Sequence, residues 1–563
     1  MKLVSAIAIA TATLGTASIA LAQPPAAAQP ANFAARADAI LDAAYPADGP
    51  GAAVVVMRGG QIVYTRGRGL ADIEGGRRIA PDTVFRLGSI TKQFTAAVIL
   101  QLVAEGKVSL DDPLTRFLPD YPQPGGSATI RQLLNHTSGV QSYTGIPGWM
   151  VEANTNRAYT TAELVGTFRN LPSPSRPGET WDYNNSGYVL LGAVIEAVTG
   201  MPWHQAVEQR ITRPLGLTTI RYGVGGEDVP AMARGYTDAD GRPGPARLIH
   251  MSVPHAAGAL VGTVGDLARW AHALHHGRVV SPELYRAMTS PAPLPGGRTH
   301  PYGFGLGLAE VRSQPAIGHG GGIFGFNTES AYIPSQDMFV AVFANSDGPA
   351  TPPGVVVHRI AALAMGDPYP EFTAAPVDLR ALEPAFGVYR VGENGPNRHF
   401  FARDGKLYTQ REGGSEREAF ATADGRFFYG PNDFTWFRLA ARPDGTRVME
   451  MHQQGGNSAE LAVRTGPIPA APAAVAVDPT VLRSYVGAYQ TAGPLATIAL
   501  TEAGGLTIQL AGQPAFPLRA VSATEFNVDQ VGARIVFESE GGRATGLVIH
   551  QGGRQLPGRR TGG

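Results

Sequence analysis

The chain has 563 residues, of which 44% are hydrophobic and 16% charged, and its 46 basic side chains balance 46 acidic ones. This length predicts several globular domains, and the balanced charge gives no excess of positive charge for nucleic acid or an anionic membrane. The absence of cysteine excludes disulfides, thiol catalysis and cysteine-ligated metals, and the 13 histidines form no H-E-x-x-H pair, so the sequence predicts no metal and no cofactor.

The first residues have the pattern of a secretory signal. Lys2 is followed by an apolar stretch of small residues that ends at Ala20-Leu21-Ala22, which predicts a signal peptide over residues 1–22. The alternative is a membrane anchor, but Ser and Thr interrupt the stretch, so it would span a bilayer poorly. We therefore expect a periplasmic or secreted protein without a membrane span once the signal is removed.

A long region of mixed helical and strand patterns follows, over residues 33–365. A flexible leader over residues 23–32 precedes it. Strand-like runs on both sides of Gly59-Gly60 predict a β-hairpin. The other predicted elements are helices over 33–44, 91–105 and 187–199 and strands over 329–333 and 338–344.

Two proline-rich segments, 366–378 and 466–479, divide the remainder of the chain. The stretches after them repeat each other at an offset of 100 residues: Val377, Asp378, Leu382, Gly387 and Tyr389 match Val477, Asp478, Leu482, Gly487 and Tyr489. We interpret residues 377–466 and 477–563 as a duplicated domain. Short alternating runs broken by glycine turns predict small antiparallel barrels or sandwiches.

A serine and a lysine three residues apart form the first motif with chemical potential. Ser89 lies where a helical pattern begins, and a helix brings Lys92 to the same face. A serine hydroxyl needs a base to become a nucleophile, and a lysine can serve when burial lowers its pKa. The alternative is that Ser89 caps the helix and Lys92 is a surface residue.

The second motif, Tyr183-Asn184-Asn185, lies just before the helix that is predicted over residues 187–199. A tyrosine near a lysine can relay protons, and Asn185 can bind a substrate carbonyl or hold the lysine in place. A plain turn with an asparagine helix cap remains the alternative.

The third motif is the glycine-rich run His319-Gly320-Gly321-Gly322. Small residues let a substrate backbone lie against a strand edge, and their N–H groups can point at an oxyanion. The alternative is a glycine-rich hairpin turn without a chemical role.

Together and in order, the three motifs resemble the serine β-lactamase and penicillin-binding protein superfamily, in particular its class C β-lactamase-like group, peptidase family S12. The resemblance extends to FRLGSITKQFTAAVILQLVAEGKVSLDDPLTRFLPD, TIRQLLNHTSGV, YNNSGYVLLGAVIEAVTG and GHGGGIFGF. It implies an α+β domain in which helices cover an antiparallel sheet, with a helical subdomain beside it. Two β-barrels after such a domain resemble the layout of D-aminopeptidases.

The resemblance also implies the roles of individual residues. Ser89 would be the nucleophile that forms an acyl-enzyme, with Lys92 and Tyr183 as the general-base pair. Asn185 would bind the substrate amide and the lysine. The backbone N–H groups of Ser89 and Gly322 would form the oxyanion hole.

The third motif departs from the class C pattern, which has Lys-Thr-Gly where this chain has His319-Gly320-Gly321. His319 and Gly321 are still expected to contact substrate, but a neutral imidazole lacks the charge that a lysine offers to a carboxylate. This argues against an efficient β-lactamase, and a histidine here resembles certain D,D-carboxypeptidases and D-aminopeptidases. We expect His136 to be a structural turn residue.

Four functions remain open from the sequence. The first is a peptidase or amidase on D-amino-acid-containing peptides, and the others are an esterase, a weak β-lactamase and a non-catalytic penicillin-binding protein. The expected partner is a small peptide, amide or ester, and the oligomeric state is not defined. We expect removal of residues 470–563 to change the substrate range more than the reactivity of the nucleophile.

Overall fold

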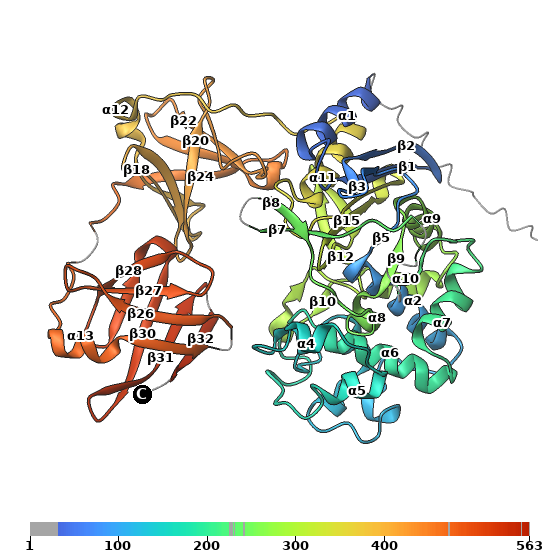
Figure 1. Cartoon of the computed structure of the whole chain (residues 1–563). Helices are drawn as coiled ribbons and strands as arrows, with labels where there is room; N and C mark the ends of the chain where they lie inside the picture. Colours follow the sequence, from blue (N-terminus) through green and yellow to red (C-terminus); the bar gives the residue numbers. More distant parts are fainter. Residues whose placement is uncertain are drawn as a thin grey trace, which may run out of the picture.

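The computed structural model describes residues 32–561, apart from residues 224–228, 230, 240–241, 471–472, 492 and 553. The predicted signal peptide over residues 1–22 lies outside the described residues. A mixed domain of helices and strands is followed by two closed β-barrels (Figure 1). Within the described part, no helix combines the length and the hydropathy needed to cross a bilayer.

A seven-stranded antiparallel sheet forms the centre of the first domain. Its order is β12-β13-β15-β16-β1-β2, and β14 pairs with β15. Every residue of β1 and β16 is buried, which explains their continuous apolar runs. The strands are β1 (Ala52–Arg58), β2 (Gln61–Arg68), β12 (Gly307–Val311), β13 (Gln314–Gly318), β14 (Gly321–Ile323), β15 (Phe326–Ile333) and β16 (Met338–Ala344).

Helices cover both faces of this sheet and build a subdomain beside it (Figure 1). One core lies between the sheet and α1 (Phe33–Ala44) and α11 (Pro353–Ala364). The larger core contains α2 (Thr91–Ala104), whose residues 91–100 are all buried, so this helix has no polar face. The other helices on this side are α3 (Ile130–Leu134), α4 (Glu152–Thr155), α5 (Thr161–Gly166), α6 (Asn185–Thr199), α7 (Trp203–Val207), α8 (His255–Gly258), α9 (Val264–His275) and α10 (Pro282–Met288).

The duplicated segments form two closed barrels of eight antiparallel strands each. Equivalent tyrosines secure the start of each barrel: the Tyr389 hydroxyl donates to the Ala385 carbonyl over 2.6 Å, and the Tyr489 hydroxyl donates to the Tyr485 carbonyl over 2.7 Å. These buried hydrogen bonds give a physical reason for the repeated Gly-x-Tyr pattern.

The first barrel follows α12 (Leu379–Leu382) and the second follows α13 (Pro479–Tyr485). The strands of the first are β17 (Gly387–Val391), β18 (Asn397–Arg403), β19 (Lys406–Arg411), β20 (Glu416–Ala421), β21 (Arg426–Phe428), β22 (Trp436–Ala441), β23 (Arg447–His452) and β24 (Glu460–Gly466). Those of the second are β25 (Gly487–Thr491), β26 (Leu495–Leu500), β27 (Leu506–Leu510), β28 (Ala515–Ala520), β29 (Glu525–Val528), β30 (Ala533–Glu540), β31 (Arg543–Gln551) and β32 (Arg554–Thr561).

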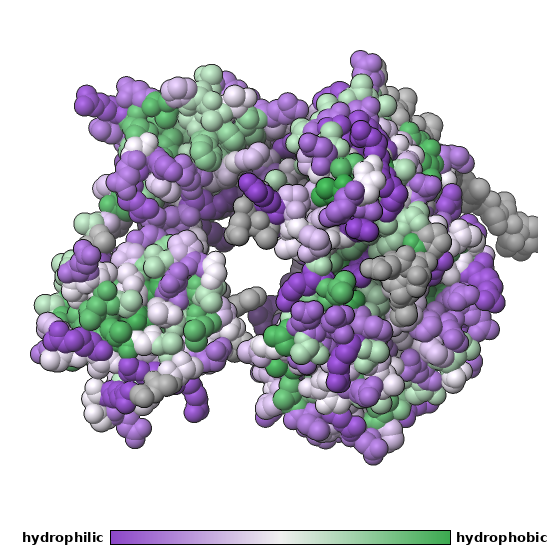
Figure 2. All heavy atoms as spheres, viewed as in Figure 1, coloured by the Kyte–Doolittle hydropathy of each residue, from purple (hydrophilic) through white to green (hydrophobic). Residues whose placement is uncertain are grey.

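Polar contacts connect the three bodies in chain order. Arg312, in the turn after β12, pairs with Asp367 over 2.7 Å and donates to the Gly455 carbonyl of the first barrel. Gln410 of the first barrel donates to the Asp529 carbonyl of the second over 2.8 Å. Figure 2 shows a largely hydrophilic face on the first domain and larger hydrophobic areas on the barrels.

Candidate active site

Ser89 and Lys92 lie together at the start of α2. Ser89 is in the single 3₁₀ turn Gly88–Ile90, and Lys92 is in the first turn of α2, so their side chains share one face. Lys92 Nζ lies 3.0 Å from Ser89 Oγ. The alternative of a capping serine and a surface lysine is wrong, because Ser89 makes no cap hydrogen bond and Lys92 is 0% exposed.

The surroundings of Lys92 favour its neutral amine. Lys92 donates to Asn185 Oδ1 over 2.8 Å and to the Ala257 carbonyl over 2.9 Å. Burial lowers the pKa of Lys92 well below its usual value. A neutral amine has two N–H groups, which these two acceptors use, so its lone pair is left to face the hydroxyl of Ser89.

Tyr183 approaches the same pair from the other side of the site. Its ring centre lies 4.8 Å from Lys92 Nζ, and its hydroxyl is buried without a hydrogen-bond partner of good geometry among the described residues. Burial raises the pKa of Tyr183, and an interaction with the Ser89 side chain partly offsets this rise. The phenol is therefore protonated at neutral pH, close to Ser89.

The asparagines beside Tyr183 have separate tasks. The side chain of Asn184 caps α6 by accepting a hydrogen bond from the Gly187 N–H over 2.9 Å, as the turn alternative predicts. Asn185 accepts from Lys92 and donates through Nδ2 to Thr144 Oγ1 over 3.0 Å. The helix cap and the contact with Lys92 coexist, because the two roles fall on neighbouring residues.

Glycines bring the third motif against the turn that carries Ser89. Gly88 has a φ of 53°, and a Cβ on it would lie 3.1 Å from the Gly322 nitrogen. A Cβ on Gly321 would lie 2.0 Å from the Leu87 carbonyl oxygen. Only residues without a side chain allow this approach, which sets the exposed Gly322 of β14 beside Ser89.

His319 is held at both ring nitrogens. Nδ1 lies 2.5 Å from the Gly320 carbonyl oxygen, and Nε2 lies 2.8 Å from the Tyr302 hydroxyl. Since a carbonyl only accepts, Nδ1 carries the proton and Tyr302 donates to Nε2. Burial is the largest cause that lowers the pKa of His319, to about 4. The imidazole is therefore neutral at pH 7, with neither nitrogen left for a substrate.

Several aromatic residues of the site carry no recognisable sequence motif. His136 lies in the turn after α3 with a φ of 64°, and its ring centre is 4.5 Å from that of Tyr183 and 4.7 Å from that of Tyr302. Its Nδ1 accepts from the Asn184 N–H over 3.1 Å. His136 thus occupies a turn and also supports Tyr183, a role that the sequence analysis missed together with Tyr302.

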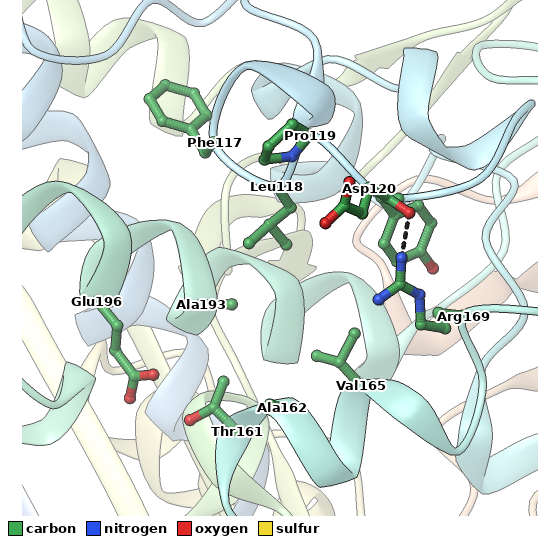
Figure 3. A pocket seen from close by; sticks show the side chains of 11 residues that line it. Phe117, Leu118, Pro119, Asp120, Thr161, Ala162, Val165, Arg169, Ala193 and Glu196 are labelled. Carbon is green, nitrogen blue, oxygen red and sulfur yellow. Dashed lines mark hydrogen bonds between the residues drawn. The ribbon is translucent and has the colours of Figure 1, made fainter.

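A separate pocket of about 320 Å³ lies between α5, α6 and residues 117–121 (Figure 3). At one side of it, Arg169 donates to the Asp120 carbonyl. Ala193 and Glu196 line it from a part of α6 that lies more than a turn beyond Asn185. None of its lining residues belongs to the three motifs, so this pocket is distinct from the candidate site.

Comparison with curated proteins finds three kinds of relative. The chain is 26% identical to penicillin-binding protein 4* of Bacillus subtilis over 67% of this chain and 87% of that protein. It is 36% identical to the esterase EstB of Burkholderia gladioli over 41% of this chain and 62% of the esterase. It is 28% identical to a D-aminopeptidase of Gluconobacter oxydans over 65% of this chain and 67% of that enzyme.

Solved structures and family models agree with these relatives. The D-amino acid amidase of Ochrobactrum anthropi SV3, solved with D-phenylalanine, superposes with a TM-score of 0.53 at 28% identity, over 60% of this chain and 99% of the amidase. The model of the β-lactamase family matches residues 39–365, which is more than half of the chain. The chain therefore belongs to the β-lactamase family and is a serine hydrolase of that fold, followed by two closed β-barrels.

Proposed function

We propose that this hydrolase cleaves small amides and peptides at a D-amino acid, as an amidase or aminopeptidase, through an acyl-enzyme on Ser89. The observation that carries the proposal is a neutral His319 beside the Ser89, Lys92 and Tyr183 group. Such a site has the parts for acyl transfer but lacks the cation that a carboxylate-bearing substrate needs in the third motif.

The first half of the proposed reaction forms the ester. Ser89 Oγ attacks the substrate carbonyl carbon as its proton passes to the lone pair of Lys92, and the N–H groups of Ser89 and Gly322 stabilise the oxyanion. As the carbon–nitrogen bond breaks, Tyr183 gives its proton to the leaving amine and takes the proton of Lys92 in return. An amine leaves and Ser89 is acylated.

The second half restores the enzyme. Water attacks the ester carbonyl and loses a proton to the Lys92–Tyr183 pair, and this proton passes to Ser89 Oγ as the ester bond breaks. The carboxylic acid is released and the three side chains regain their original protonation. Asn185 keeps Lys92 aimed at Ser89 throughout, because its amide is itself anchored on Thr144.

The chemistry of His319 supports the choice of substrate class. A carboxypeptidase or β-lactamase binds a substrate carboxylate, which a fixed positive charge stabilises. Both nitrogens of His319 are engaged by Tyr302 and Gly320, so the ring offers neither charge nor a free donor. The similarity to a D-aminopeptidase and to a D-amino acid amidase favours the same class.

An esterase is the second candidate function, favoured by the 36% identity with EstB. The same machinery would cleave esters, because an alkoxide or phenolate is a better leaving group than an amine. A complete Ser89–Lys92–Tyr183 group argues against a non-catalytic penicillin-binding protein. A neutral His319 argues against a β-lactamase.

A panel of four substrates separates these functions. The purified protein is assayed with D-alanyl-p-nitroanilide, its L-isomer, p-nitrophenyl acetate and nitrocefin, with Ser89→Ala as the control. We expect turnover of the D-anilide above the L-isomer and above nitrocefin, and no turnover by Ser89→Ala. Turnover of the acetate alone would favour the esterase, and activity retained by Ser89→Ala would refute the acyl-enzyme on Ser89.

We also propose that the protein is exported, on the pattern of residues 1–22 alone. Expression of the full chain in a Gram-negative host, followed by fractionation and N-terminal sequencing, tests this. We expect a periplasmic product that begins at Gln23, whereas a cytoplasmic product that retains Met1 and Lys2 would contradict it.

A further inference from the structure

Three side chains converge at the C-terminal end of α9. His272 and His276 lie one helical turn apart, and Asp337 comes from the turn between β15 and β16. Their metal-ligating atoms, one from each residue, all lie within 4.8 Å of one another. Asp337 lies 61 positions after His276 in the sequence, so no short motif indicates this group.

The hydrogen bond of His276 uses Nδ1 and leaves Nε2 to face Asp337. Nδ1 lies 2.9 Å from the His272 carbonyl oxygen, which only accepts, so Nδ1 carries the proton of the neutral ring. Nε2 then presents a lone pair at 3.2 Å from Asp337 Oδ1. Two acceptors at this distance repel each other unless a proton or a metal ion lies between them.

Neighbouring groups orient the Asp337 side chain and leave space for that of His272. The Tyr332 hydroxyl donates to Asp337 Oδ1 over 3.0 Å, and the Asp337 carbonyl accepts from the Gly59 N–H over 3.0 Å. A Cβ on Gly60 would lie 2.9 Å from ring atoms of His272, so this glycine makes room for the imidazole. Outer hydrogen bonds of this kind orient ligands in metal sites.

We propose that His272, His276 and Asp337 bind a divalent transition-metal ion of the Zn²⁺ type. Two imidazoles and one carboxylate are ligands that Zn²⁺ prefers, with a water molecule in the fourth position. Ligand atoms around tetrahedral Zn²⁺ lie about 3.4 Å apart, which the His276–Asp337 pair already matches. The ligand atom of His272 lies within 4.8 Å of the other two, so only a small movement of its side chain would be needed to complete the site. The side chains of His276 and Asp337 are 27% and 26% exposed, so an ion can enter.

The bound ion would join three segments of the first domain. It would tie the end of α9 to the β15–β16 turn, whose Asp337 backbone already binds the β1–β2 turn at Gly59. The helix α9 packs against β1 and β16 of the sheet, and Figure 1 shows it close to these strands. Since metal binds the folded state and not the dispersed ligands, it would raise the thermal stability of the domain. The inference does not rest on the proposed function.

Isothermal titration of the protein with ZnCl₂, on material without a histidine tag, tests the site. We expect one equivalent of Zn²⁺ to bind and the unfolding temperature to rise with the Zn²⁺ concentration. Asp337→Asn keeps the acceptor for Tyr332 and suits the left-handed backbone at φ 41°, but it removes the charge. We expect it to weaken Zn²⁺ binding by more than about tenfold without lowering the unfolding temperature of the metal-free protein.

Two further variants complete the test. His276→Gln removes a ligand and should weaken binding to the same degree, whereas His204→Gln, a half-buried helical histidine on α7, should bind Zn²⁺ as the unchanged protein does. Absence of Zn²⁺ binding would mean that an ion pair alone joins His276 and Asp337. Equal binding by all variants would place the ion elsewhere, and either result overturns the proposal.

Discussion

The Tyr302 hydroxyl donates to Nε2 of His319 over 2.8 Å, while Nδ1 of the same ring is held by the Gly320 carbonyl. With these two contacts, His319, which lies between β13 and β14, has an uncharged ring with both nitrogens engaged. The ring centre of Tyr302 also lies 4.7 Å from that of His136, and this packing helps to hold the Tyr302 hydroxyl toward His319.

Replacing His319 by lysine should shift the substrate preference toward carboxylates. His319→Lys would supply the positive charge that the neutral imidazole lacks. We expect the ratio of kcat/KM for nitrocefin to kcat/KM for p-nitrophenyl acetate to rise at least about tenfold, which corresponds to about 1.4 kcal/mol of added transition-state binding. Tyr302→Phe is the matched control, because it removes the hydrogen bond without adding charge and should leave this ratio low. An unchanged ratio in His319→Lys would mean that charge at this position does not select the substrate.

Lys92 should control the acid limb of the pH profile. Burial lowers the pKa of Lys92 well below its usual value, which favours the neutral amine that can act as a base. Activity should be full above this lowered pKa and should be lost as the pH falls through it, because protonation removes the lone pair that faces Ser89. The check is kcat/KM for p-nitrophenyl acetate, measured from pH 4 to pH 10.

Lys92→Arg separates the charge of this residue from its basicity. A guanidinium stays protonated throughout this pH range and cannot accept the serine proton. We expect kcat/KM to fall by about 10²–10⁴-fold at pH values above the acid limb, and we expect the variant to show no acid limb of its own. If the variant kept a tenth of the activity, Lys92 would not be the base.

Tyr183 should matter more for amides than for activated esters. The pKa of Tyr183 is raised by burial, so its phenol holds a proton that a leaving amine needs. p-Nitrophenolate leaves without one. In Tyr183→Phe we expect kcat/KM for D-alanyl-p-nitroanilide to fall at least about tenfold more than kcat/KM for p-nitrophenyl acetate. Equal losses on both substrates would point to a role in positioning rather than in proton transfer to the leaving group.

Local spacing was enough to predict part of this site. The contact between Ser89 and Lys92 follows from helical geometry, and the duplicated segments predicted the two barrels through their repeated residues. His136 and Tyr302 could not be found in this way. Each is fixed by contacts with segments distant in the sequence, and no short pattern encodes that His136 would pack between Tyr183 and Tyr302.

The charge state of His319 was also beyond the sequence. A neutral histidine was expected in this motif, but the burial that lowers its pKa to about 4 comes from segments distant in the sequence. The tautomer depends on the Gly320 carbonyl and on Tyr302. Such properties arise only when the strands and the helical subdomain are assembled around the ring.

Glu329 should make stability depend on pH. Its carboxyl group lies against Gly320 and Gly354, accepts one hydrogen bond from the Ser330 N–H over 2.9 Å, and has its pKa raised by burial to about 7. A carboxyl whose pKa is higher in the folded than in the unfolded protein does not lower the free energy of unfolding while it is protonated in both states. As the pH rises above the pKa of the unfolded state, this carboxyl lowers the free energy of unfolding. The loss is complete above pH 7 and amounts to up to about 3 kcal/mol.

Glu329→Gln tests this cost because glutamine keeps the acceptor for Ser330. We expect the variant to unfold at a higher temperature than the unchanged protein at pH 8 and at the same temperature at pH 4. Glu310→Gln, at an exposed position of β12 in the same sheet, is the control and should change neither value. A stabilisation of Glu329→Gln that is equal at both pH values would rule out titration of this carboxyl as the cause.

Removal of the second barrel should leave the nucleophile intact. Ser89, Lys92, Tyr183 and Gly322 all lie in the first domain, and the hydrogen bond from Gln410 to Asp529 attaches the second barrel to the first barrel. A chain that ends at residue 469 should therefore fold and should hydrolyse p-nitrophenyl acetate within about twofold of the full rate. The same truncated protein tests the prediction that the second barrel affects the substrate range. The measurement is the ratio of kcat/KM for D-alanyl-p-nitroanilide to kcat/KM for longer D-peptides. A large loss of acetate turnover in a folded truncation would mean that the barrel supports the chemistry itself, and an unaltered ratio would mean that it does not select substrates.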